Sequence, residues 1–65
     1  MIIQPNEISA HSCSTGTEVF TVLPGVSVRR NDEIHHAGRR YSVQRVQRVM
    51  TNGSTVVCAN YAGKL

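Results

Sequence analysis

Residues 38–53 read Gly-Arg-Arg-Tyr-Ser-Val-Gln-Arg-Val-Gln-Arg-Val-Met-Thr-Asn-Gly, and this stretch decides the fold. Polar and apolar residues alternate at its start, which is typical of a half-buried strand. Three valines then recur at every third position: Val43, Val46 and Val49. A spacing of three fits neither a regular strand nor a regular helix, and a helix is one interpretation. The interpretation we favour is a strand over residues 40–49 with a β-bulge near Gln44-Arg45, which returns Val46 to the inner face and bends the strand.

Turn signals outside this stretch divide the remaining chain into short strands. Pro24-Gly25, Asn31-Asp32 and Ala37-Gly38 predict turns, and Gly38 can supply a positive φ. Asn52-Gly53 is the strongest hairpin signal, because both residues tolerate the positive φ of a type I′ turn. The predicted strands besides 40–49 cover residues 18–23, 26–29, 33–36 and 55–61.

Composition favours the same β-rich interpretation. The chain has 65 residues, of which 40% are hydrophobic. Half of the hydrophobic residues are Val or Ile, whose branched side chains suit a pleated surface. We therefore predict an all-β fold: a small, partly open, SH3-like β-barrel of four to five strands. Residues 1–17 are expected to form an extended N-terminal arm, residues 18–61 the barrel and residues 62–65 a C-terminal tail. Pairing of Met1–Ile3 as an edge strand, or its docking on a neighbour, is an alternative for the start of the arm. The predicted core consists of Ile34, Tyr41, Val43, Val46, Val57 and Ala59.

The chemistry-bearing residues do not predict an enzyme. The two cysteines, Cys13 and Cys58, are 45 positions apart and are expected to be free thiols, Cys13 exposed and Cys58 buried. The spacing of the cysteines and histidines matches no metal motif, and His35 and His36 point to opposite faces of a regular strand. No glycine-rich phosphate loop, secretory signal or membrane-spanning run is recognisable. We assign no catalytic, cofactor-binding or metal-ligating residue.

Positive charge is the clearest functional signal. The formal net charge is +3, and six of the seven basic residues are arginines that fall between residues 29 and 48. Guanidinium groups suit planar recognition of carboxylates and phosphates. The alternative is a solvated basic face on a small domain with few acidic residues. Only three residues are Phe or Tyr, which is too few for an obvious base-stacking platform. The expected partner-binding residues are these arginines and the apolar start of the chain: Met1, Ile2, Ile3, Arg29, Arg30, Arg39, Arg40, Arg45 and Arg48.

Residues 26–61 resemble the short barrel segment of head–tail joining proteins of tailed bacteriophages, of the attachment or stopper type. The resemblance is carried by residues 29–34, by Gly38-Arg39-Arg40-Tyr41-Ser42-Val43, by Arg45-Val46 and by the hairpin at residues 52–57. It implies a structural virion protein, present in the host cytoplasm during assembly, that forms a ring of identical copies. Met1–Ile3 would then add a strand to a neighbour's sheet. The arginines would contact neighbouring virion proteins (portal, adaptor, tail or capsid) or DNA phosphate.

Two other classes fit the same residues. One is a small basic inhibitor or adaptor that binds an acidic protein surface. The other is a nucleic-acid-binding barrel, whose affinity would weaken steeply with salt because phosphate contacts release counterions. No membrane partner is expected in any of the three.

Overall fold

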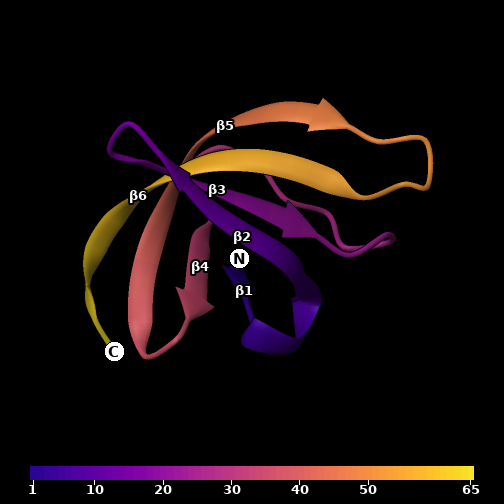
Figure 1. The fold of residues 1–65 in the computed structure, drawn as a ribbon. Helices are drawn as coiled ribbons and strands as arrows, with labels where there is room; N and C mark the ends of the chain where they lie inside the picture. Colours follow the sequence, from indigo (N-terminus) through magenta and orange to yellow (C-terminus); the bar gives the residue numbers. More distant parts are fainter.

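The computed structural model describes residues 1–65, which form a single curled sheet (Figure 1). The elements are β1 (Ile2–Ile3), the 3-10 turn η1 (Pro5–Glu7), β2 (Ile8–Ser14), β3 (Thr17–Val22), β4 (Glu33–His36), β5 (Arg39–Val49) and β6 (Thr55–Lys64). Their order across the sheet is β1-β4-β5-β6-β3-β2. All pairs are antiparallel except β1 with β4, which is parallel. The predicted all-β class and partly open barrel are therefore confirmed.

The N-terminal segment belongs to the barrel, so the prediction of a separate arm over residues 1–17 was wrong. Its residues form β1, η1 and β2, and the two strands are the edges of the sheet. The chain joins these edges through only four residues, which requires the sheet to curl until they approach each other. The expected C-terminal tail is also in the sheet, because β6 continues to Lys64. These additions raise the strand count to six.

The turns explain why the chain reverses where it does. Thr15-Gly16 and Ala37-Gly38 are two-residue hairpin loops in which both residues have positive φ, as a type I′ turn requires. Pro24-Gly25 also forms the expected turn, with Gly25 at φ 86° and the Val26 amide donating to the Leu23 carbonyl at 3.2 Å. Residues 26–29, predicted as a strand, are irregular instead.

The turn between β5 and β6 differs from the predicted type I′ geometry. Only Gly53 has a positive φ there, at 91°, while Asn52 does not. The Gly53 amide donates to the Met50 carbonyl at 3.0 Å, and the Met50 amide donates to the Ser54 carbonyl at 2.7 Å. The Asn52 side chain accepts a hydrogen bond from the Ser54 amide at 2.9 Å. This combination is a longer loop that ends in a glycine with left-handed backbone geometry.

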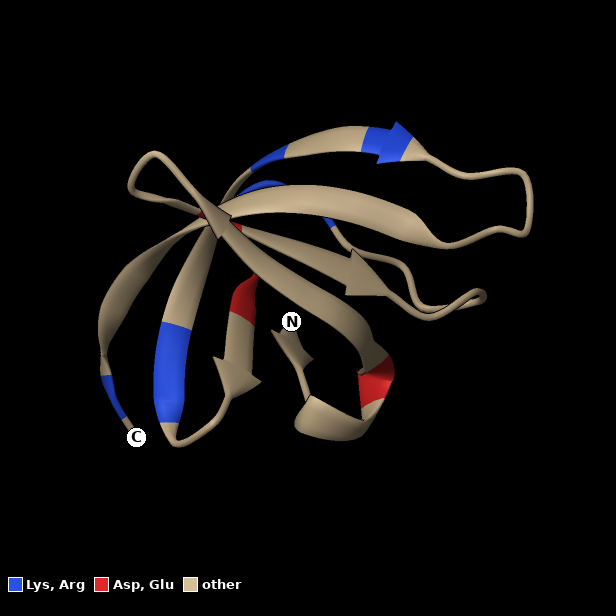
Figure 2. Ribbon diagram, viewed as in Figure 1, with Lys and Arg blue, Asp and Glu red and all other residues tan.

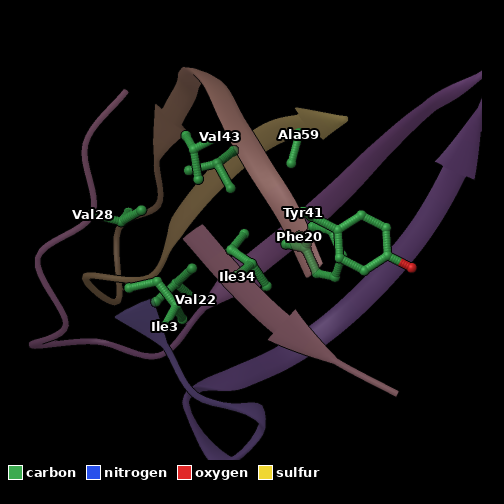
Figure 3. Close-up of a cluster of buried hydrophobic side chains, with 9 residues drawn as sticks. Ile3, Phe20, Val22, Val28, Ile34, Tyr41, Val43 and Ala59 are labelled. Carbon is green, nitrogen blue, oxygen red and sulfur yellow. The ribbon is translucent and has the colours of Figure 1, made fainter. Parts of the chain in front are cut away.

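The core fills the inside of the curl (Figure 3). Phe20 is its largest fully buried side chain, and Ile3, Val22, Ile34, Val43 and Val57 are fully buried with it. Of the predicted core residues, all are buried except Val46, which is 40% exposed. Val28 is buried even though its segment is not a strand. Ile3, placed in the arm by the sequence, is a core residue because β1 covers the open side of β4.

Candidate interaction surface

The unusual valine spacing in β5 is produced by a repeated β-bulge. Val43 pairs with Ala59, Val46 with Val57 and Val49 with Thr55. Each step of three residues on β5 therefore faces a step of two residues on β6. The register shifts between Val43 and Arg45 and again between Val46 and Arg48, so each Val-Gln-Arg unit holds one extra residue. The predicted bulge near Gln44-Arg45 is confirmed, and a second bulge follows it.

Because each bulge absorbs one residue, all three valines stay on the inner face of the sheet. Their surroundings nevertheless change along the strand: Val43 is fully buried, Val46 is 40% exposed and Val49 is 66% exposed. The β5–β6 hairpin extends beyond the core in this direction (Figure 1). Met50, at its end, is 41% exposed. We call Val46 and Val49 the apolar hairpin face. The prediction that Val46 fills the core was wrong because no strand lies over this part of the hairpin.

The glutamines and arginines of the two units lie on the opposite, outer side. Gln44 and Arg45 lie across from Cys58, and Gln47 and Arg48 lie across from Val56. Both β6 residues are buried, and the Cys58 thiol donates a hydrogen bond to Oε1 of Gln47 at 3.2 Å. The long side chains thus cover apolar strand surface with their stems while their polar ends stay exposed. We call Gln44, Arg45, Gln47 and Arg48 the Gln–Arg face.

The same part of β5 has a free backbone edge. The pairing of β4 with β5 ends at Ser42, and the last bonds on that side join Val43 to the backbone of Asn31 and Asp32. From Gln44 to Val49 the strand pairs only with β6. Its outward amide and carbonyl groups are therefore available to a partner.

The acidic side chains have partners within the chain, whereas most of the arginines do not. All four carboxylates are already engaged: Glu18 with His11, Asp32 with the terminal ammonium, Glu33 with His35 and Arg40, and Glu7 with the Gln4 amide. Arg40 is the only arginine within 4.0 Å of a carboxylate. The five arginines without such a partner are Arg29, Arg30, Arg39, Arg45 and Arg48. No acidic residue lies on β5 or β6. The chain therefore presents unneutralised positive charge, much of it on β5 (Figure 2).

The predicted partner-binding residues do not form one patch. Arg45 and Arg48 lie on the outer part of β5, whereas Arg39 and Arg40 lie at its opposite end. The Arg39 guanidinium carbon is 5.8 Å from the ring centroid of Tyr61, and Arg40 donates to the Ala62 carbonyl at 3.4 Å. The remaining residues are spread over the loop before β4 and the N-terminus: Arg29, Arg30, Met1 and Ile2 are exposed, while Ile3 is buried.

A second cluster, which the sequence did not predict, lies at one open end of the barrel. The rings of His11, Phe20, His36 and Tyr41 contact one another across strands β2, β3, β4 and β5. Tyr61 of β6 extends the cluster with its centroid 5.9 Å from that of Tyr41. The centroids of His11 and His36 are 5.0 Å apart, although β2 and β4 are not paired. Side-chain packing therefore joins β2 to β4 and closes this part of the barrel, where no backbone hydrogen bonds join the two strands.

The Glu18 carboxylate forms hydrogen bonds with His11 and Cys13 beside this cluster, and we call these three side chains its polar rim. Its Oε1 atom lies 2.6 Å from Nε2 of His11, and its hydrogen bonds to His11 and Cys13 hold the pKa of Glu18 below the ordinary value of 4.5. In turn, the hydrogen bond to the Glu18 carboxylate raises the pKa of the Cys13 thiol above 9.0. Cys13 is exposed, but its raised pKa keeps the thiol protonated at neutral pH, which is the opposite of an activated nucleophile.

The remaining features are the two thiols and one surface hollow. Both cysteines are free, as expected, and no group of three or more His, Cys, Asp or Glu side chains is arranged to hold a metal ion. One hollow of about 320 Å³ is lined by Met1, Ser27, Arg29 and Asp32. No helix has the length and apolarity needed to cross a membrane.

Comparison with protein-family models, with curated proteins and with solved structures gave no match.

Proposed function

We propose that this protein is a structural assembly module that forms a ring of identical copies through the apolar hairpin face, as a head–tail connector or stopper of a tailed phage. The observation that carries the proposal is the exposure of Val46 and Val49 on the inner side of a hairpin that extends beyond the core. A small domain gains stability when such surface is buried against another subunit. The likeness of residues 26–61 to the barrel segment of connectors supports the virion role.

The charge distribution indicates how the copies meet. All four acidic side chains already have a partner within their own chain, so ion pairs between copies would have to replace these contacts. An apolar contact is therefore the favoured one, and the positive charge of Arg45 and Arg48 opposes it. Self-association is therefore expected to strengthen with salt, because salt screens this repulsion.

Sedimentation velocity over a range of protein and salt concentrations tests the proposal. We expect concentration-dependent oligomers that increase with salt and that the double variant V46T/V49T abolishes. The matched control is I2T, which changes an exposed residue of β1 and leaves the hairpin intact. If the protein stays monomeric under all conditions, or if I2T and V46T/V49T behave alike, association through the hairpin is excluded. Detection of the protein in purified phage particles tests the virion role separately.

A further inference from the structure

We propose that the Gln–Arg face of β5 binds the phosphate backbone of duplex DNA without reading its sequence. This inference concerns the outer side of the hairpin and does not rest on self-association through its inner side. It begins from charge: Arg45 and Arg48 are exposed, lack a carboxylate partner and lie on β5, which carries no acidic residue and pairs with β6, which carries none either. A partner that complements this face must bring its own negative charge.

The spacing of the two arginines favours a regular polyanion. Each Val-Gln-Arg unit advances along β6 by two residues, which is about 6.8 Å for an antiparallel strand. This repeat is similar to the separation of successive phosphates along one strand of a nucleic acid. The two bulges thus present equivalent arginines at the repeat of a phosphate backbone. A nucleic acid offers this repeat along its whole length, whereas a protein surface offers it only where acidic residues lie two positions apart on one strand.

The other groups on this surface suit phosphate oxygens. Gln44 and Gln47 are exposed beside the arginines, and side-chain amides commonly donate to phosphates. The free edge of β5 adds backbone amides, which bind phosphates in the same way. The four residues include no aromatic ring, and the exposed Tyr61 lies toward the other end of β5, where it faces Tyr41. Single-strand binding commonly relies on stacked aromatic side chains, so a duplex is the better fit.

Fluorescence anisotropy with a short labelled DNA duplex, at salt concentrations between about 50 and 200 mM, tests the inference. We expect the affinity to fall linearly with salt on a log–log plot. The double variant R45Q/R48Q should reduce the slope by about 2, since each lost phosphate contact removes about 0.9, and should weaken binding roughly tenfold at the lowest salt. The variant R29Q/R30Q loses the same charge from a loop and should keep the wild-type slope.

Three results would overturn the inference. The first is an equal effect of the two arginine pairs, which would indicate attraction by net charge alone. The second is the absence of any slope change in R45Q/R48Q when its thermal unfolding matches that of the wild type. The third is competition in which polyglutamate displaces the duplex more effectively than unlabelled DNA does, which would assign the face to an acidic protein. Repeating the titration with V46T/V49T separates the result from self-association: retained DNA binding by a monomer supports the inference even where ring formation fails.

Discussion

The imidazole of His11 lies flat on the ring of Phe20, with 4.4 Å between the ring centroids and 10° between the planes. Phe20 is fully buried, so the edge strand β2 contributes a polar ring to the end of the core. The other side of the arrangement is polar, because Nε2 of His11 forms a hydrogen bond with Glu18 of β3. One side chain of an edge strand therefore links the apolar core to the polar rim.

Replacing Glu18 with glutamine should change the response of the fold to acid. The pKa of Glu18 is lowered in the folded chain by its hydrogen bonds to His11 and Cys13. A carboxylate whose pKa is lowered on folding stabilises the fold at pH values above its ordinary pKa of 4.5. This stabilisation is lost as the pH falls through the pKa of the folded state. E18Q lacks the contribution at every pH. Thermal unfolding should show a lower midpoint for E18Q at pH 7 and a difference that shrinks below pH 4.5; a difference independent of pH would contradict this.

The same substitution should make Cys13 more reactive. The Glu18 carboxylate keeps this thiol protonated, and only the thiolate reacts with iodoacetamide. Removing the negative charge should lower the pKa of Cys13 and accelerate its alkylation at neutral pH severalfold. Mass spectrometry of peptides follows each cysteine separately, and the buried Cys58 is the internal control, unreactive in both proteins. Equal rates at Cys13 would show that Glu18 does not control this thiol.

Two valines of the same repeat should differ sharply in their contribution to stability. Val43 is fully buried, whereas Val49 is 66% exposed on the same face of the same strand. V43A should lower the free energy of unfolding by about 2 kcal/mol, because it removes buried methyl groups and leaves a cavity. V49A should lower it by less than about 0.5 kcal/mol. Urea unfolding of the monomer measures both; similar losses would mean that the outer hairpin is covered in solution.

The glycine that closes the β5–β6 loop should be hard to replace. Gly53 has a φ of 91°, and a Cβ added there would lie 3.4 Å from Cβ of Pro24. G53A should destabilise the fold by about 1–2 kcal/mol, the typical cost of left-handed backbone geometry for an ordinary residue. G53N is the matched comparison, because asparagine tolerates positive φ better. Thermal unfolding should rank wild type above G53N and G53N above G53A; if both variants unfold alike, contact with Pro24 dominates.

Local sequence patterns predicted the fold class, the strands at residues 33–36 and 40–49, and the first bulge. These features depend on turn residues and on side-chain alternation, which are visible in a single segment. The second bulge follows from the same Val-Gln-Arg unit, but its position depends on pairing with β6. Val46 was misplaced because a valine on an inner face is buried only where another element covers it.

The N-terminal segment was misjudged for a different reason. Residues 9–17 are small and polar, and β2 is an edge strand with mostly exposed side chains, so its composition is that of a loop. Its pairing with β3 depends on long-range contacts that local patterns do not record. The ring cluster was missed for the same reason, since His11 and His36 are 25 positions apart and meet only across the opening of the barrel.

Because three residues of β5 pair with two residues of β6 in each unit, the length of the hairpin can also change by whole units. One Val-Gln-Arg unit could be added or removed together with two residues of β6, and all the remaining side chains would stay on their original faces. A deletion of one residue in a regular strand would instead turn the following side chains over. Hairpin length can therefore vary by whole repeats, both in evolution and in design. Each added repeat would place one more valine on the inner face and one more arginine on the outer face.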